Sequence, residues 1–276
     1  MSYKRILTIQ DISCLGQCSM TVALPILSAC GHETCILPSA VLSTHTGGFN
    51  GFTVRDLTDD LPGIEKHWNK EGITFDAIYT GYLGSTKQID YVESIFRSTL
   101  APSGKIAVDP AMADHGKLYP GFDMEYVEAM KKLCRFADVV LPNITEGCLL
   151  TEHPYQEVYD EAYISQLLEK LHALGAKCVV LTGVSYEPGL TGAVVSEGGE
   201  TRYYAHRRVP KNYHGTGDIF SSAFVGAWMR GKTMLDAVKV AAEYTVLSIE
   251  NTISDDAHWY GVKFEAAIPM LVESFK

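Results

Sequence analysis

The sequence predicts an α/β protein in which a mostly parallel central sheet carries helices on both faces, a single-domain three-layer fold. Short runs rich in β-branched residues alternate with longer runs of helical periodicity, which is typical of βαβ units. The chain has 276 residues, of which 46% are hydrophobic, so it can bury one large core. No linker, repeat or low-complexity segment divides residues 1–276, and we expect a single domain.

The first part of the chain predicts two strands, one helix and a flexible loop. Residues 4–10 form a buried apolar run, and residues 35–43 form a second extended run. Between them, residues 18–30 carry apolar side chains at helical spacing. The stretch 43–54 has too many glycines for regular structure, so we expect a small mobile flap there.

Strands and helices then alternate regularly along the chain. The short stretches are rich in β-branched residues, and the long ones carry apolar residues every three or four positions. The expected strands cover 76–82, 105–108, 138–141 and 177–181, and the expected helices cover 87–100, 124–135, 144–150, 163–174, 219–228, 234–248 and 264–274. Residues 193–196 and 201–205 predict a hairpin at one edge of the sheet.

Composition and charge exclude several classes of function. The formal net charge of −10 argues against nucleic-acid binding, which needs a basic face. No apolar run reaches the length of a membrane span, and the N-terminus has no secretory signal, so we expect a cytoplasmic protein. The cysteines are odd in number and form no Cys-x-x-Cys pair, which predicts neither a disulfide framework nor a zinc site. They are Cys14, Cys18, Cys30, Cys35, Cys134, Cys148 and Cys178.

The stretch Gly215-Thr216-Gly217-Asp218 is the strongest candidate for a functional site. Its glycines allow a tight turn, and the residues that follow have helical periodicity. A glycine-rich turn that opens a helix directs unpaired N–H groups and the positive end of the helix dipole at a ligand, which favours an anion. Asp218 would lie beside that anion and could take a proton from an attacking hydroxyl. The alternative is that Asp218 is only a helix cap and that the glycines only form a turn.

Two other nucleotide motifs do not apply. Residues 226–233 match the P-loop pattern letter for letter. A P-loop follows a strand and opens a helix, however, whereas this match lies at the end of the helix after Asp218. Gly231 is better explained as the residue that ends this helix. The dinucleotide fingerprint also fails, because only Gly16 follows the first strand and no acidic residue stands at the expected place.

Polar residues follow most of the expected strands. They are Asp11, Thr80-Gly81-Tyr82, Asp109-Pro110, Asn143 and Thr182-Gly183. Because ligands bind beyond the carboxyl ends of parallel strands, these residues predict one polar rim. We call the glycine turn at residues 215–217 the anion loop. Oxygen ligands beside such a loop are typical of a Mg²⁺-dependent phosphoryl transferase. Each residue also has a structural explanation: Asn143 and Glu146 fit a capping box, Asp109 fits a turn, and Tyr82 could be a packed aromatic.

Together these residues resemble the ribokinase-like superfamily of small-molecule kinases, and within it the pyridoxal (pyridoxine, pyridoxamine) kinases. The resemblance runs from Ile9 to about Ile253. It rests on Gly215-Thr216-Gly217-Asp218, Ile9-Gln10, Ser43-Thr44-His45-Thr46-Gly47, Thr80-Gly81-Tyr82-Leu83-Gly84-Ser85, Asp109-Pro110 with Asp114, and Pro142-Asn143 with Glu146. It implies a ribokinase-like fold and an ATP-dependent kinase that phosphorylates the 5′-hydroxyl of a B6 vitamer.

The resemblance also implies a role for each candidate residue. Asp218 would be the base, and the N–H groups of Gly215, Thr216 and Gly217 would hold the transferred phosphate. Mg²⁺ would be bound through water by Asp114, with Asp109 and Glu146 beside the β- and γ-phosphates and a monovalent cation, K⁺ or Na⁺. Asn143 and Thr182 would contact the ATP phosphates. Tyr82 would stack on the pyridine ring, Thr46 would bond the ring substituents, and His45 would be a further substrate-binding residue of the same flap. The family is usually dimeric, so a homodimer is expected.

The sequence departs from the family pattern at Asp11, where related kinases have a serine that touches the pyridine nitrogen. A carboxylate there would favour a protonated ring. Alternatively, Ser13 makes the contact or the ring is a different one. Three other functions stay open: a hydroxymethylpyrimidine kinase, a sugar kinase, and a vitamer- or nucleotide-binding protein without turnover. Arg207, Arg208 and Lys211 precede the anion loop and could cover the nucleotide or form a solvated charged run, and we favour the charged run.

Overall fold

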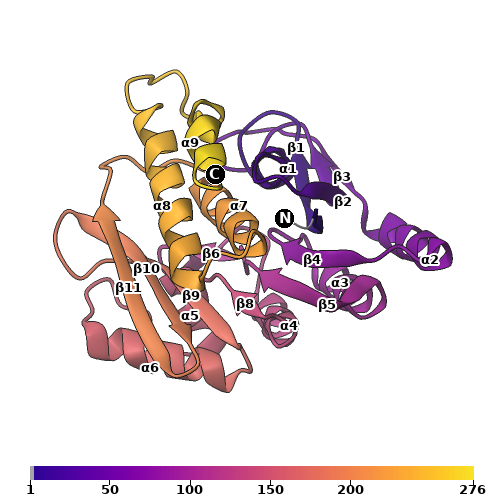
Figure 1. Cartoon of the computed structure of the whole chain (residues 1–276), viewed down its shortest axis with the longest axis horizontal. Coiled ribbons are helices and arrows are strands. Elements are labelled where there is room, and N and C mark those ends of the chain that lie inside the picture. Colours follow the sequence, from indigo (N-terminus) through magenta and orange to yellow (C-terminus); the bar gives the residue numbers. More distant parts are fainter. Residues whose placement is uncertain (1–2) are drawn as a thin grey trace.

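The structure is a computed structural model that describes residues 3–276. Its centre is a nine-stranded sheet with the strand order β11-β10-β9-β8-β5-β4-β1-β2-β3 (Figure 1). The strands are β1 (Arg5–Ser13), β2 (Glu33–Leu42), β3 (Val54–Asp56), β4 (Phe75–Thr80), β5 (Leu100–Val108), β8 (Val139–Val140), β9 (Cys178–Val184), β10 (Leu190–Glu197) and β11 (Glu200–Arg207). From β9 to β2 all neighbours are parallel, while the strands at the two edges are antiparallel. The predicted mostly parallel sheet and its edge hairpin are confirmed.

Helices cover both faces of the sheet (Figure 1). One face carries α1 (Met20–Ala29), α7 (Thr216–Met229), α8 (Met234–Glu250), η2 (Phe264–Ala267) and α9 (Ile268–Glu273). The other carries α2 (Leu61–Glu71), α3 (Thr86–Thr99), α4 (Met124–Cys134), α5 (Ile144–Thr151) and α6 (Glu161–Ala173). A short η1 turn (Thr58–Asp60) precedes α2, and a small hairpin of β6 (Ala113–Asp114) and β7 (Lys117–Leu118) follows β5.

The two faces have separate hydrophobic cores because side chains alternate along each strand. On β1, Leu7 and Ile9 pack toward α2–α6, whereas Ile6 packs toward α1 and α7. On β4, Ile78 packs toward α2–α6 and Tyr79 packs toward α1 and α7. Parallel strands buried on both faces therefore read as continuous apolar runs, which is why the sequence indicated them clearly.

Helices α1 and α7 lie side by side and run in the same direction. Near their C-terminal ends, a Cβ added at Gly226 would lie 2.4 Å from Sγ of Cys30. At their N-terminal ends, Ser19 precedes α1 and its N–H bonds to Asp218 in the first turn of α7. Gly226 is thus a packing glycine inside α7, and Gly231, with φ of 90°, follows the helix. This confirms that residues 226–233 are not a P-loop.

Several elements differ from the sequence prediction. Helix α2 and the edge strand β3 were not predicted, because α2 opens with Leu61-Pro62-Gly63, which resembles a turn, and buries only Leu61. Strand β1 was predicted to end before Asp11 but continues to Ser13, with a register shift between Gln10 and Ile12. The expected last helix begins as the 3₁₀ turn η2.

Two further properties concern thiols and membranes. All seven cysteines carry free thiols, and four of them are buried. None of the helices in the described residues 3–276 combines the length and the apolar character needed to span a bilayer.

Candidate active site

The polar rim lies at the carboxyl ends of the parallel strands. Asp11 lies at the register shift of β1, and Asp109 directly follows β5. Asn143 follows β8 and pairs with Thr182 of β9 through an isolated parallel bridge. Thr182 was expected just beyond its strand but lies within β9. These residues therefore share one edge of the sheet, as the sequence predicted.

The start of α7 contains the anion loop. Gly215 has φ of 78°, and a Cβ there would lie 1.8 Å from the carbonyl oxygen of Gln17, so only glycine fits. No side chain caps this helix, and the same holds for α1, α2 and α9. The other helices are capped: Ser85, Asp123, Asn143, Asp160 and Thr233 cap α3, α4, α5, α6 and α8. A Cβ at Gly217 would meet no atom within 4 Å. The uncapped N–H groups thus face open space that an anion could fill.

Asp218 is not the cap of α7, and the structure corrects that alternative. The cap position is Gly215, and Asp218 is the third residue of the helix. Oδ2 of Asp218 accepts a hydrogen bond from the N–H of Ser19 at 2.9 Å. Burial raises the pKa of Asp218 to about 7, and the charges of Asp109 and Asp11 add to the rise. A carboxyl with a pKa near neutrality is suited to general base catalysis.

Ser19 connects two of the carboxylates. It has φ of 52°, which is unusual for a residue other than glycine, and it is buried. Its N–H donates to Asp218, and its side chain lowers the pKa of Asp11 against the effect of burial. Because Ser19 also stands directly before α1, the N-termini of α1 and α7 both point into the site, and their dipoles both favour a negative charge there.

Asp109 and Glu146 form a second, deeper carboxylate pair. Oδ2 of Asp109 accepts a hydrogen bond from Ser221 Oγ at 2.7 Å. Glu146 is 3% exposed, and its carboxylate accepts hydrogen bonds from the N–H groups of Asn143 (2.9 Å) and Met112 (3.0 Å). Burial raises the pKa of both groups, and the charge of Asp109 raises the pKa of Glu146 further. The pair is therefore a site where a bound cation would be strongly favoured.

The site carboxylates have no protein cation beside them. Within residues 3–276, no lysine or arginine forms an ion pair with Asp11, Asp109, Glu146 or Asp218. Among these residues no three His, Cys, Asp or Glu side chains are grouped closely enough to hold a metal ion by themselves. The donor set, isolated carboxylates beside an anion loop, fits Mg²⁺ held partly by water and phosphate oxygens.

Asn143 and Asp114 differ in their surroundings. Asn143 forms the predicted capping box with Glu146, and its Nδ2 also donates to the carbonyl of Ala113 at 2.8 Å. Capping and a role in the site therefore coexist in the same residues. Asp114 lies on the β6–β7 hairpin with its side chain 56% exposed, and it accepts from the N–H of His115 at 2.8 Å. It is the most solvent-accessible carboxylate of the predicted set.

The acceptor side of the site is aromatic. Tyr82 stacks on Phe122 with a centroid distance of 5.3 Å, and Phe122 stacks on Tyr126 at 3.8 Å. Burial raises the pKa of Tyr82, and the charge of Asp11 adds to the rise. Ser13 is fully buried and donates to Oδ2 of Asp11 at 3.2 Å. The Ser13 hydroxyl thus donates its hydrogen bond to Asp11.

The flap contains His45 and Thr46. His45 is buried, and its ring nitrogens are both used inside the protein: Nε2 lies 2.7 Å from the carbonyl oxygen of Tyr260, and Nδ1 accepts from the N–H of Gly47 at 3.1 Å. His45 therefore holds the flap in place and has no free nitrogen for a substrate. Thr46 is exposed at the tip of the flap.

Three residues of the site were missed by the sequence analysis. Ser221 could have been found, because it stands three positions after Asp218 and so on the same face of α7. Ser19 gave no signal, since its role depends on a positive φ. Tyr119 gave none either. Burial raises its pKa, and the charges of Glu146, Asp114 and Asp109 add to the rise.

The structure combines a three-layer α/β fold with an uncapped glycine turn at the start of α7. Asp218 is a half-buried carboxylate in the first turn of that helix, and further carboxylates lie along the rim. This combination is typical of small-molecule kinases of the ribokinase-like superfamily. Comparison with known proteins agrees with this class. The sequence model of the phosphomethylpyrimidine kinase family matches residues 40–262, most of the chain. The chain belongs to this family.

Its relatives include pyridoxal kinases. A pyridoxal kinase of Arabidopsis thaliana is 25% identical over 264 residues, covering 91% of this chain and 83% of the plant protein. The crystal structure of pyridoxal kinase from Lactobacillus plantarum superposes with a TM-score of 0.91 at 32% identity, covering 99% and 98% of the two chains. A Bacteroides thetaiotaomicron protein, provisionally described as a phosphomethylpyrimidine kinase and crystallised with pyridoxal, gives a TM-score of 0.91 at 36% identity over 98% and 96%.

Proposed function

We propose that this protein transfers the γ-phosphoryl group of ATP to the 5′-hydroxyl of pyridoxal, pyridoxamine or pyridoxine. The observation that carries the proposal is Asp218, half-buried in the first turn of α7 and beside the uncapped N–H groups of the anion loop. One of its oxygens is held by Ser19, and the other is available to an acceptor hydroxyl. The kinship with pyridoxal kinases supports the B6 acceptor.

The protein contributes positioning and charge to this reaction. Gly215, Thr216 and Gly217 direct their N–H groups at the transferred phosphate, and Asp218 takes the hydroxyl proton. Asn143 and Thr182, adjacent at the rim, lie where the ATP phosphates would extend. Mg²⁺, when bound, neutralises charge on the phosphates. Asp114 would hold it through water, while Asp109 and Glu146 would lie beside it and a monovalent cation.

The acceptor pocket suits a flat aromatic ring. Tyr82 offers a ring face on one side, Asp11 offers a carboxylate, and the flap with Thr46 covers the opening. We expect the protein to act as a homodimer, as the resemblance implies. A second candidate activity is phosphorylation of hydroxymethylpyrimidine, because the family model that matches residues 40–262 is that of phosphomethylpyrimidine kinase.

A panel of acceptors tests the proposed function. ADP release is measured with ATP and Mg²⁺ against pyridoxal, pyridoxamine, pyridoxine, hydroxymethylpyrimidine and ribose. We expect kcat/KM to be highest for a B6 vitamer. Turnover confined to the pyrimidine or to ribose would keep the mechanism and replace the acceptor. Tight vitamer binding without ADP release with any acceptor would instead indicate a binding protein.

Changing Asp11 to serine tests the contact with the pyridine ring. A hydrogen bond to a charged partner contributes about 1.5–3 kcal/mol, so we expect KM for the preferred vitamer to rise about tenfold or more. Burial raises the pKa of Asp11, so in the wild type KM should also rise as the pH falls and Asp11 takes up a proton. Michaelis constants for all three vitamers are measured across pH. Ser13→Ala is the control, because it removes the hydroxyl that donates to Asp11 and leaves the carboxylate in place. Unchanged values and pH dependence in Asp11→Ser would rule the contact out.

A further inference from the structure

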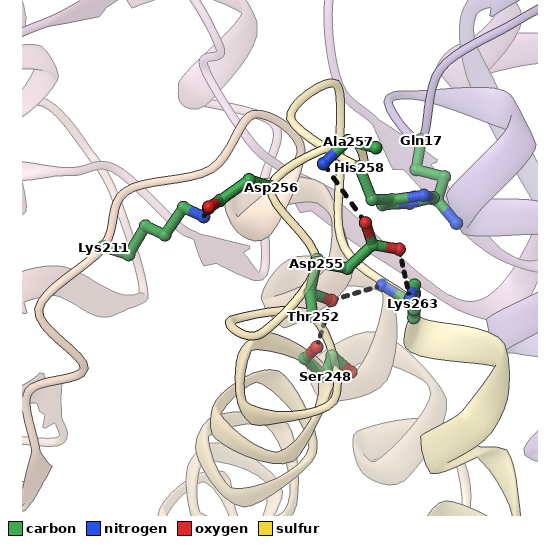
Figure 2. A network of polar contacts seen from close by, with 9 residues as sticks. All are labelled: Gln17, Lys211, Ser248, Thr252, Asp255, Asp256, Ala257, His258 and Lys263. Atoms are coloured by element: carbon green, nitrogen blue, oxygen red, sulfur yellow. Dashed lines mark hydrogen bonds and ion pairs between the residues drawn. The ribbon is translucent and has the colours of Figure 1, made fainter.

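An irregular segment in the C-terminal part of the chain, residues 255–261, contacts the flap and Gln17, and we call it the strap. Its base is anchored between α8 and η2 (Figure 2). Asp255 accepts hydrogen bonds from the N–H of Ala257 at 3.1 Å and from Lys263 Nζ at 2.7 Å, and the N–H of Lys263 donates to Thr252 Oγ1 at 2.8 Å. These contacts hold the strap in one conformation at the end of α8.

The strap packs on the flap. The rings of Trp259 and Phe49 lie 4.6 Å apart, and a Cβ added at Gly48 would lie 2.8 Å from the Trp259 ring. The carbonyl oxygen of Tyr260 binds Nε2 of His45 at 2.7 Å. In the described chain the flap thus has an aromatic contact and a hydrogen bond with the strap.

The strap also contacts the segments that lead to the anion loop. His258 Nε2 lies 2.7 Å from Gln17 Oε1 (Figure 2). The backbone carbonyl oxygen of Gln17 lies so close to Gly215 that a Cβ there would be 1.8 Å from it. From the other side, Lys211 Nζ forms an ion pair with Asp256 at 2.9 Å (Figure 2). Lys211 therefore has a specific partner, although the sequence suggested that it was part of a solvated charged run.

The flap and the anion loop also touch directly. The rings of His45 and His214 lie 5.3 Å apart, and a Cβ at Gly47 would lie 2.6 Å from the His214 ring. Because His214 immediately precedes Gly215, any shift of the anion loop on nucleotide binding displaces a residue that supports the flap. Flap, strap and anion loop thus form one packed unit around His45.

We propose that the strap couples nucleotide binding to closure of the flap, with Trp259 and Asp256 as positioning residues. The proposal rests on the proposed function, because it assigns the flap to the acceptor. Nucleotide held at residues 215–217 fixes His214 and Gln17; these fix the strap, and the strap holds Phe49 and His45 over the acceptor. Acceptor and nucleotide then bind with positive cooperativity, and the coupling is reciprocal.

Hydrogen exchange of the flap amides, residues 44–50, tests the coupling without an acceptor. Exchange is followed by mass spectrometry with and without Mg²⁺ and a non-hydrolysable ATP analogue, in the wild type, Trp259→Ala and Asp256→Asn. We expect the nucleotide to slow flap exchange about fivefold or more in the wild type, within the usual range of allosteric coupling. The slowing should largely disappear in Trp259→Ala and weaken by less in Asp256→Asn, because an exposed ion pair contributes little.

Two controls separate coupling from general loosening. Tyr3→Ala removes an exposed aromatic far from the strap, and Trp259→Phe keeps a ring that can pack on Phe49. Both should retain the protection given by the nucleotide. Equal protection in the wild type and Trp259→Ala, or no protection in the wild type, would overturn the proposal. In turnover, Trp259→Ala should raise KM for the acceptor several-fold with little change in kcat, since an aromatic pair contributes about 0.5–1.5 kcal/mol. Failure of every B6 vitamer in turnover would refute the proposed acceptor, whereas the exchange result would still decide the coupling.

Discussion

Replacing Asp218 by asparagine is expected to lower kcat by about 10³-fold, because a positioned general base contributes about 10²–10⁴-fold. Asparagine keeps the size of the side chain and can still accept the N–H of Ser19, which lies 2.9 Å from Oδ2. It cannot take a proton from the acceptor hydroxyl. The measurement is steady-state ADP release with saturating ATP, Mg²⁺ and pyridoxal, with the fold checked by circular dichroism. A kcat within tenfold of the wild type would exclude Asp218 as the base.

The pH dependence of the same enzyme provides an independent check. Burial raises the pKa of Asp218 to about 7, so the carboxyl becomes protonated as the pH falls below neutrality and can no longer act as a base. The kcat/KM of the wild type should therefore decrease as the pH falls below about 7. This decrease reflects the ionisation of Asp218 in the free enzyme. Asp218→Asn should lose the part of this decrease that comes from kcat, whereas any part that comes from protonation of Asp11 and a higher KM should remain. An equal decrease in kcat with falling pH in both proteins would assign the titration to another group.

Replacing Gly215 by alanine is expected to abolish measurable activity and to destabilise the fold. The new Cβ would lie 1.8 Å from the carbonyl oxygen of Gln17, and the residue would have to adopt φ of 78°. A left-handed non-glycine residue and an overpacked contact each cost about 1–3 kcal/mol, so unfolding in urea should show a loss of about 3 kcal/mol or more. An alanine variant with wild-type stability would mean that the turn can rearrange.

Gly217→Ala is the matched control for that loop. Its Cβ would meet no protein atom within 4 Å, so the free energy of unfolding should change by less than about 1 kcal/mol. The added methyl group would instead occupy the space where the phosphate is expected. We expect kcat/KM for ATP to fall about 10²-fold or more, the effect of losing one hydrogen-bond donor to a developing charge. Full activity in Gly217→Ala would place the phosphate elsewhere.

The sequence predicted the sheet, most helices and the gathering of polar residues at one rim. These features depend on local periodicity and on the rule that ligands bind at the carboxyl ends of parallel strands. Asp109, Asn143 and Thr182 could be assigned to one edge because each stands close to the carboxyl end of a buried strand. The capping box of Asn143 and Glu146 was also visible, since its spacing is fixed by helix geometry.

What the sequence did not reveal depends on backbone conformation and on contacts between distant segments. The position of Ser19 requires φ of 52°, and its partner Asp218 is 199 residues away. The contact of Trp259 with Phe49 joins the C-terminal part of the chain to the flap, and no local pattern indicates it. The burial of Glu146 was likewise invisible, because its capping role alone would be compatible with an exposed helix start.

The packing of α1 against α7 at Gly226 has a consequence for how the active site tolerates change. Ser19 and Asp218 stand at one end of these parallel helices, while Cys30 and Gly226 touch near the other end. Gly226 stands eight positions after Asp218 in α7, a rise of about 12 Å along the helix. A larger side chain at position 226 would meet Cys30 and push α7 away from α1, so we expect it to shift Asp218 without touching any substrate. The position of the catalytic carboxylate thus depends on Gly226, a residue of the hydrophobic core that would contact no substrate.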